Sequence, residues 1–364
     1  MPRFLLWPVW ILQLFGGAKS FESNPLLGSA TLNRWGLHTA RIRLAHWATR
    51  LRWWLLAPLA PADLRRRFLA QGYLVLENFL PDDAFERLRA GAVTGQAEVR
   101  EMIQGDTATL RVLFDARALA QLPECRALLE RRSFINLLRY CAATLRWPQF
   151  SLQCIKNGGG HDPQKDLHAD TFHPTMKAWL FLSDADARNG PFTFVPGSQR
   201  ATAARLAWER EQSLRAGRGN RYSARGSLRI APDELARLGL PPPVAFNVKA
   251  NTLVIANTHG FHRRGDAPAG ASRLEIYASS RTNPFLPLPM PGSLRLARLE
   301  HALVAAYYRR MDRRAAARGV PSSWHLVPAE SWRSALAQLP SPSLTTLAPV
   351  NSPNAGPPTP AVAK

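Results

Sequence analysis

The sequence predicts an α+β fold with a mainly β core, a sandwich or barrel flanked by helices. Between residues 150 and 280 the chain consists of short apolar segments, rich in β-branched and aromatic residues and separated by turns. Many short strands at this spacing are typical of sandwiches and barrels. On both sides of this region, apolar residues recur at three- and four-residue spacing, which indicates helices.

The expected strands can be placed one by one. Six of them lie at 151–156, 176–182, 192–195, 244–248, 252–256 and 273–279, and a seventh at 72–76. The turns between them contain the sequences NGGG at 157–160, NGP at 189–191 and PG at 196–197. Glycine and asparagine adopt the backbone conformations that such turns require.

Helices are expected around these strands. One begins after Pro81, where two aspartates occupy the first turn, and leucines at helical spacing continue through 115–145. The arginine-rich stretch 200–238 is expected to be a helical insertion at the rim, and 293–338 to form C-terminal helices. We therefore assign the main domain to 61–338, between an N-terminal basic, Trp-rich arm at 1–60 and a disordered Pro/Ser/Thr/Ala-rich tail at 339–364.

Charge and cysteine content narrow the class of protein. The chain has 47 lysines and arginines against 26 acidic residues, a formal net charge of +21. Such a charge attracts phosphates, acidic lipids or anionic substrates, but the basic residues are spread along the chain. With no nucleic-acid-binding motif, no nucleic-acid partner is expected. Three widely spaced cysteines argue against a disulfide scaffold and favour a reduced, cytoplasmic protein.

The arm allows two interpretations. Residues 1–15 hold too few consecutive apolar residues to span a bilayer, and Pro8 with a poor cleavage site argues against an exported leader. Residues 37–56 mix arginines with leucines and tryptophans, as in basic amphipathic helices. Such a helix either lies on an anionic membrane as a peripheral contact or packs on the main domain through its arginine stems.

The candidate chemistry lies in the segments LHADTFH at 167–173 and THGFHRR at 258–264. In an extended chain, His168 and Asp170 project to the same side and can bind one ion. His262, from another strand, would complete a set of two histidines and one carboxylate. That set suits Fe(II), because it leaves positions open for substrates and O₂. An H-x-D pair alone is weak evidence in a chain with nine histidines.

The sequence around this pair resembles the phytanoyl-CoA dioxygenase family. In HADTFHPTMKAWLFLSDADARNGPFTFVPGSQR, at 168–200, the H-x-D precedes an apolar strand, an acidic loop, N-G-P and a strand ending in P-G-S. Gln199 stands where the family has a histidine. Residues 72–81 (GYLVLENFLP) and 251–281 continue the resemblance, which covers about 65–285. It implies a double-stranded β-helix of the jelly-roll or cupin type.

The resemblance also implies an activity. The protein would be an Fe(II)/2-oxoglutarate-dependent dioxygenase with His168, Asp170 and His262 as catalytic metal ligands. Arg273, eleven residues after His262, would hold 2-oxoglutarate. O₂ would be the second co-substrate, with ascorbate in support. Because Asp170 is retained, the expected reaction is hydroxylation with release of succinate and CO₂, on an unidentified small-molecule, lipid or acyl substrate.

Several assignments stay open in the sequence. His259 is an alternative third ligand, and Arg264 or Arg281 an alternative to Arg273. His173 is expected on the substrate side or as a support for a ligand. The remaining candidates are the hydrogen-bonding neighbours Thr171 and Thr193, and the pair Lys177 and Trp179, which share one face of a strand that points either inward or outward. Arginines at 200–226 suggest that the substrate is anionic.

Two other functions fit parts of the sequence. A non-enzymatic membrane- or nucleic-acid-associated protein on a degenerate barrel would use the positive charge. A zinc hydrolase would use the same ligands, since zinc also accepts two histidines, a carboxylate and water. Against the first, the sequence contains no recognised nucleic-acid-binding motif. Against the second, it contains no H-E-x-x-H motif, and Arg273 would have no role in a zinc hydrolase.

Overall fold

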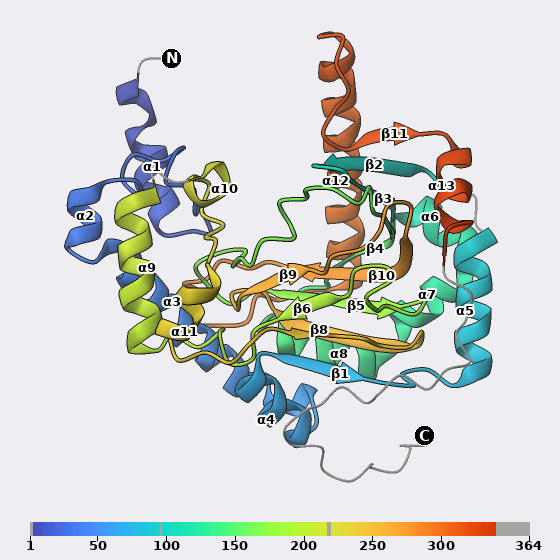
Figure 1. The fold of residues 1–364 in the computed structure, drawn as a ribbon, viewed down its shortest axis with the longest axis horizontal. Helices are drawn as coiled ribbons and strands as arrows, with labels where there is room; N and C mark the ends of the chain where they lie inside the picture. The colour runs from blue at the N-terminus through green and yellow to red at the C-terminus, as the bar shows by residue number, and fades with distance from the viewer. Residues whose placement is uncertain (1–2, 95–96, 217–219, 340–364) are drawn as a thin grey trace.

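The computed structural model describes residues 3–94, 97–216 and 220–339. At its centre, two antiparallel sheets face each other (Figure 1). The larger sheet has eight strands in the order β1 (Tyr73–Leu76), β8 (Thr252–Asn257), β5 (Met176–Phe181), β10 (Ser272–Ser280), β4 (Gln149–Lys156), β3 (Thr107–Leu113), β2 (Val99–Gln104) and β11 (His325–Val327). The smaller has three, in the order β7 (Val244–Ala245), β6 (Phe192–Phe194) and β9 (His262–Arg264).

Strand β5 shows how the core is divided into two layers. Because successive residues of a strand project to opposite faces, Trp179 and Phe181 point between the sheets and pack in one cluster with Phe192 and Phe194. Leu180 points the other way, into the layer between the larger sheet and its helices. The sheet is therefore buried on both faces here, which explains the almost unbroken apolar sequence of β5.

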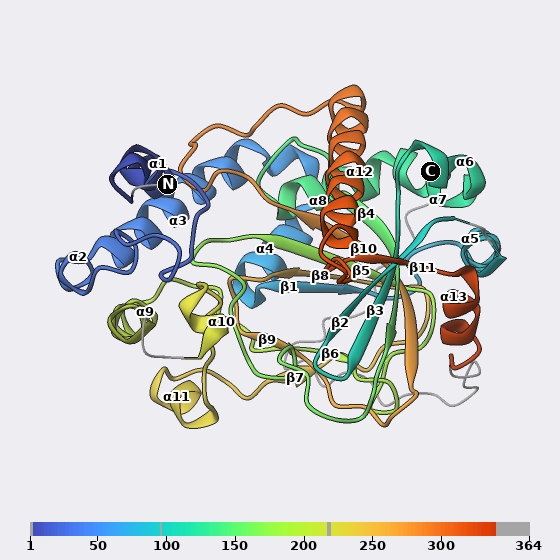
Figure 2. The same cartoon turned by 90° about the horizontal axis from the view of Figure 1, so that it is seen from above.

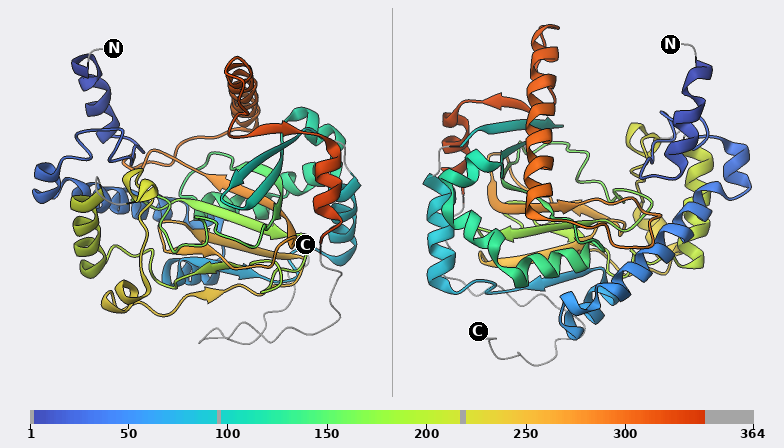
Figure 3. Two further views of the ribbon diagram at one scale, coloured as in Figure 1. Left: turned by 45° about the horizontal axis from the view of Figure 1, so that its top comes forward. Right: turned by 180° about the vertical axis from the view of Figure 1, so that it is seen from behind.

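Helices cover the outer face of the larger sheet (Figure 3). Helix α8 contacts β5 and β8 and buries Phe134, Ile135 and Leu138 on one side, as an amphipathic helix does. The helices of this layer and its edges are α4 (Ala62–Gln71), α5 (Asp82–Thr94), α6 (Ala116–Gln121), α7 (Pro123–Glu130) and α8 (Arg132–Cys141), with the 3₁₀ turn η2 at Ala57–Leu59.

The arm is folded onto the domain. Its elements are η1 (Arg3–Leu6), α1 (Trp7–Leu14), α2 (Ala30–Arg34) and α3 (Leu37–Leu55). Helices α2 and α3 lie against α9 (Figure 2), and the buried Arg52 donates to the carbonyls of Pro284 and Leu286. One of the two interpretations of the arm, packing through arginine side chains, is thus realised. The other face of α3 still exposes Trp47 and Trp54.

The fold confirms the predicted class, a mainly β double-stranded β-helix flanked by helices. The predicted strands are present with shifted ends, and the largest difference is at 244–248, where only Val244–Ala245 is strand. The stretch 200–238 is helical as expected, forming α9 (Ala203–Arg215), α10 (Arg221–Ala224) and α11 (Pro232–Arg237). Strands β2, β3 and β9 were not predicted.

The C-terminal part requires a correction. Residues 293–338 were expected to be helices, but α12 (Leu294–Ala316) and α13 (Ala329–Leu336) are separated by β11. This strand is three residues long and pairs with the edge strand β2, so its conformation depends on a partner distant in sequence rather than on its own periodicity. The predicted tail lies outside the described residues from 340 onward, and the division at residue 60 stays a prediction.

Candidate metal centre

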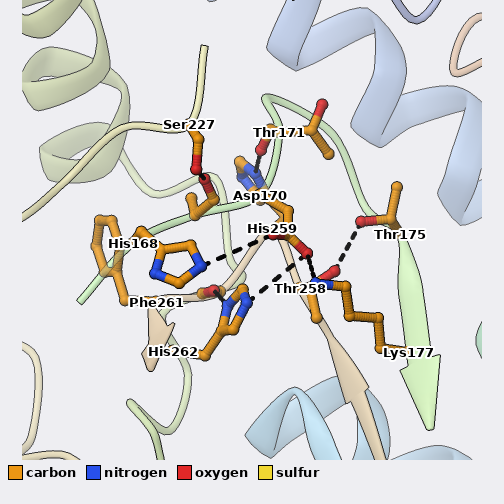
Figure 4. Close-up of polar contacts among 12 residues, drawn as sticks. His168, Asp170, Thr171, Thr175, Lys177, Ser227, Thr258, His259, Phe261 and His262 are labelled. Carbon is orange, nitrogen blue, oxygen red and sulfur yellow. Dashed lines mark hydrogen bonds and ion pairs between the residues drawn. The ribbon is translucent and has the colours of Figure 1, made fainter. Parts of the chain in front are cut away.

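Three side chains converge between the end of one loop and the start of β9 (Figure 4). His168, Asp170 and His262 each offer one potential metal ligand, and the three ligand atoms lie within 4.8 Å of one another. Asp170 lies between the two rings: its Oδ1 is 3.8 Å from His168 Nε2, and its Oδ2 is 3.7 Å from His262 Nε2. The structure therefore brings together the three residues that were predicted from the sequence as metal ligands.

The backbone places these side chains. His168 and His262 form an antiparallel bridge with hydrogen bonds in both directions, 3.0 Å and 2.9 Å long. The extended backbone through His168 also turns Asp170, two residues later, to the same side. The amide of Asp170 is held by the carbonyl of Thr258, at 3.0 Å. Two segments 94 residues apart are thereby fixed against each other.

Hydrogen bonds also orient both rings. His168 Nδ1 lies 2.7 Å from the carbonyl of Asp166, and His262 Nδ1 lies 2.9 Å from the carbonyl of Gly260. A carbonyl only accepts, so each Nδ1 carries the proton and each Nε2 is left as a lone pair. His262 Nε2 is buried and has no hydrogen-bond partner among the described residues. A buried acceptor without a partner is costly, and a metal ion held by this ligand set would satisfy it.

The protonation states also fit a metal ion. Burial, together with the neighbouring His262, lowers the pKa of His168 well below its usual range, and burial lowers the pKa of His262 to about 4. Burial would raise the pKa of Asp170, but Lys177 and the two histidines outweigh it and hold that pKa well below its usual range. At neutral pH the site thus offers two neutral imidazoles and one carboxylate, the forms that bind metals.

Gly260 allows the second segment to approach β6. A Cβ atom at this position would lie 2.3 Å from Cζ of Phe194 and 3.0 Å from Oγ of Ser198. Both neighbours are buried, so a larger residue has no space. The same glycine supplies the carbonyl that orients His262, and the close packing therefore helps to position this ligand.

The alternative ligand His259 faces elsewhere. Its Nδ1 lies 2.9 Å from the carbonyl of Thr171, and its ring meets that of His46 edge-on at 4.9 Å between centroids. It does not belong to the metal-ligand cluster found among the described residues. The geometry favours His262 over His259.

The three candidate arginines for 2-oxoglutarate have different surroundings. Arg273 is buried on β10, where its Nε donates to Oε2 of Glu275 at 3.0 Å and its Nη1 to the carbonyls of Asn189 and Gly190. Arg264 is paired with Asp162 at 2.5 Å. Arg281, by contrast, lines a pocket beside Asp170.

The other sequence candidates are distributed around the centre. Lys177 and Trp179 point inward: the ammonium of Lys177 reaches Asp170, and Trp179 stacks on Phe192 with centroids 4.3 Å apart. His173 is buried, with Nδ1 3.1 Å from the carbonyl of Pro174. Of the remaining candidates, Thr193 donates to the carbonyl of Pro191, Thr171 has no hydroxyl partner among the described residues, and Gln199 donates to the carbonyls of Leu69 and Ala70.

Two cavities are relevant to ligand binding. A pocket of about 100 Å³ adjoins the metal-ligand cluster through Asp170, and His173 and Lys177 also line it. A larger cavity of about 950 Å³ lies among residues of α6, α7 and α12 and includes none of the three candidate metal ligands.

Residues 68–235 match the model of the phytanoyl-CoA dioxygenase (PhyH) family. The protein carries a PhyH domain. The match includes His168 and Asp170 and ends before His262 and Arg273. Together with the His-Asp-His cluster, the PhyH domain makes the protein a 2-oxoglutarate-dependent non-haem iron oxygenase.

Solved structures resemble part of this chain, at low identity. The alpha ketoglutarate dependent epimerase SnoN from nogalamycin biosynthesis is 20% identical, covering 60% of this chain and 82% of its own, with a TM-score of 0.38. HygX from Streptomyces hygroscopicus, solved with nickel and 2-oxoglutarate, is 17% identical, covering 60% and 86%, with a TM-score of 0.40. EctD from S. alaskensis is 15% identical, covering 61% and 76%, with a TM-score of 0.40. No curated protein matches the sequence.

Two charged residues near the metal centre were not predicted from the sequence. Glu275 lies two residues after Arg273, so the alternation of a strand already placed both on one face. Lys19 belongs to the arm, and its ammonium donates to the carbonyl of Asp170. No signal in the sequence connects positions so far apart.

Proposed function

We propose that the protein hydroxylates a small-molecule, lipid or acyl substrate, using Fe(II) held by His168, Asp170 and His262. The main support for this proposal is that two neutral imidazoles and one carboxylate converge, with their potential ligand atoms within 4.8 Å of one another. Bound Fe(II), 2-oxoglutarate and O₂ would supply the oxidising power, with succinate and CO₂ as by-products. Ascorbate would support the reaction by keeping the iron reduced.

The protein's own residues orient and protect this centre. The carbonyls of Asp166 and Gly260 present each Nε2 toward the ion. Lys177 holds one oxygen of Asp170, with 2.6 Å between Nζ and Oδ2. Both histidines are buried, at 2% and 4% exposed, so bulk water has little access from their side.

Arg273 is the proposed partner of the distal carboxylate of 2-oxoglutarate. Its guanidinium uses Nε and Nη1 for protein acceptors, whereas Nη2 has no hydrogen bond among the described residues. The Glu275 carboxylate competes for the same guanidinium and lowers the affinity for the co-substrate. Arg264, which pairs with Asp162, and Arg281, which lines the pocket beside Asp170, are the alternatives.

An anaerobic titration tests the proposed function. Purified protein with Fe(II) and 2-oxoglutarate is expected to develop the weak visible metal-to-ligand charge-transfer band, which zinc, with its filled d shell, does not give. His168→Ala and His262→Ala abolish the band, while His259→Ala retains it. A folded wild-type protein that binds no Fe(II) and shows no band contradicts the proposal. A band lost in His259→Ala but not in His262→Ala contradicts the ligand assignment.

We propose the cytoplasm as the place of action. All three cysteines are buried free thiols, and burial raises the pKa of Cys125 and Cys154 to about 12. Such thiols stay protonated and unreactive, as is common in proteins of a reducing compartment.

A peripheral membrane contact through the arm is also proposed. Helix α1 has no buried residue and exposes Trp7, Ile11 and Leu12 by 46–71%. On α3, Trp47 and Trp54 are 57% and 72% exposed. Exposed tryptophans on a chain of net charge +21 suit the interface of an anionic bilayer. In the described part of the chain, no helix combines the length and apolar character needed to cross a bilayer.

A further inference from the structure

The pocket beside Asp170 contains more positive charge than the metal centre uses. Three cations line it, Lys19, Lys177 and Arg281, together with a single acid, Asp170. Lys177 and Asp170 form an ion pair at 2.6 Å and neutralise each other. Lys19 and Arg281 remain as two positive charges facing one small volume.

Neither of these two cations forms an ion pair with a described acidic residue. Among the described residues, no carboxylate lies within ion-pair distance, 4.0 Å, of Lys19 Nζ or of the Arg281 guanidinium. The ammonium of Lys19 donates to the backbone carbonyl of Asp170, an uncharged acceptor. Two like charges held close together repel each other, and an anion between them would remove this cost.

Unused hydroxyl groups in the same pocket provide a second, independent observation. The Oγ1 atoms of Thr171 and Thr282 are buried, and neither has a hydrogen-bond partner among the described residues. A buried hydroxyl without a partner costs free energy. Both residues line the pocket, so a ligand with acceptor oxygens would satisfy them.

No described residue of the arginine-rich insertion at 200–238 lines this pocket. Arg205 is paired with Glu209, and Arg215 with Glu211. Their charges are therefore neutralised within α9. The expectation of an anionic substrate, which rested on these arginines, now rests on residues of the arm and of the segment after β10.

We propose that this pocket binds an anionic group of the prime substrate, a carboxylate or a phosphate. Lys19 and Arg281 provide the charge, and the hydroxyls of Thr171 and Thr282 donate hydrogen bonds to its oxygens. A volume of about 100 Å³ accommodates one such group, so the rest of the substrate extends beyond the pocket. The inference rests on the proposed function, because Asp170, shared with the metal centre, brings the bound substrate next to the iron.

Phosphate titration of the full-length protein tests this assignment. Inorganic phosphate and acetate are titrated calorimetrically into the metal-free protein and into protein loaded anaerobically with Fe(II) and 2-oxoglutarate. We expect one phosphate site, weakened at least about tenfold by Lys19→Met and by Arg281→Met, since each removes a charge-assisted contact. The matched controls Lys165→Met and Arg66→Met leave the affinity unchanged. Thermal unfolding verifies that every variant is folded.

The possible outcomes distinguish a failure of the anion-binding assignment from a failure of the proposed function. If phosphate does not bind, or binds equally well to both pocket variants, the inference is wrong even when the charge-transfer band is normal. If Lys19→Met and Arg281→Met weaken 2-oxoglutarate instead, or if phosphate competes with it, the pocket belongs to the co-substrate and the inference is again wrong. Absence of the band in the wild type would refute the proposed function, while phosphate binding to the metal-free protein is measured independently of it.

Discussion

The ammonium of Lys177 lies 2.6 Å from the carboxylate of Asp170, the acidic member of the metal-ligand cluster. Lys177 projects inward from β5, whereas Asp170 belongs to the loop before that strand (Figure 4). Burial lowers the pKa of Lys177, but Asp170 and Tyr277 together outweigh the desolvation and raise that pKa. A fixed positive charge thus keeps the ligand ionised without occupying both of its oxygens.

Lys177→Met is therefore expected to make metal binding more sensitive to acid. Without the ammonium, burial raises the pKa of Asp170, and protons compete with the metal at higher pH. The midpoint for loss of Co(II) or Fe(II) should move upward by about one pH unit or more. Metal titrations between pH 4 and 8 measure it, with Lys156→Met as the control. An unmoved midpoint contradicts the role of Lys177 as a positioning residue.

Glu275→Gln is expected to tighten 2-oxoglutarate binding by about tenfold, since a neutral amide no longer competes for the Arg273 guanidinium. Arg273→Gln in the same background should weaken it by about 10- to 100-fold and leave Fe(II) in place. Using this background avoids leaving a buried carboxylate unpaired. The charge-transfer band, titrated with 2-oxoglutarate, reports both changes. Loss of iron and co-substrate together would instead exclude Arg273 from a specific role.

Because His46 is buried, we expect the free energy of unfolding to fall as the pH is lowered. Burial first, and then Arg205 and Arg50, lower its pKa from 6.5 to about 4. The unfolded chain therefore takes up a proton at higher pH than the folded one, so stability falls between pH 6.5 and 4 and levels off below. The contribution is about 3 kcal/mol. Urea unfolding of wild type and His46→Gln across this range should show a shallower loss in the variant; identical slopes contradict the assignment.

Gly260→Ala is expected to destabilise the protein by about 1–3 kcal/mol, because the new Cβ overlaps the buried ring of Phe194. It should also weaken metal binding, since the carbonyl that orients His262 must move. Thermal unfolding and metal titration measure the two effects. Gly91→Ala is the control: it lies in α5 with its nearest neighbour 3.9 Å from the added atom, and should be neutral or stabilising.

Replacing Trp47 and Trp54 by serine is expected to reduce binding to vesicles containing anionic phosphatidylglycerol. These two rings are exposed, while the opposite face of α3 is packed, so the domain should remain folded. Cosedimentation with anionic and with neutral vesicles measures the binding. Ile103→Ser, at a position 61% exposed on β2, is the control. Equal binding by wild type and the double variant ends the membrane proposal.

Much of the fold followed from local patterns. Seven strands of the two sheets were predicted from composition and turns, because β-branched and aromatic residues suit a pleated surface buried on at least one side. Strands β2, β3, β9 and β11 were not predicted, and β9 and β11 have only three residues each. Their conformation comes from the strands beside them.

Of the three candidate iron ligands, two could be predicted from local sequence and the third depended on tertiary contacts. The alternation of an extended chain by itself determined that His168 and Asp170 point together, because that geometry needs only a backbone. The choice of His262 over His259 required the bridge between His168 and His262, a contact between segments far apart in the chain. Glu275 could have been anticipated as the neighbour of Arg273 from the same alternation.

The sequence by itself determined the barrel, the chemical type of its metal centre and the presence of an arm. Only the tertiary structure decided that Lys19 of the arm lies over Asp170, and that Lys177 rather than an insertion arginine neutralises that ligand. The physical reason is that charges act through space. Which charged residues become partners depends on how the chain folds in space. The number of residues between two charges in the sequence does not predict the distance between them in the folded protein.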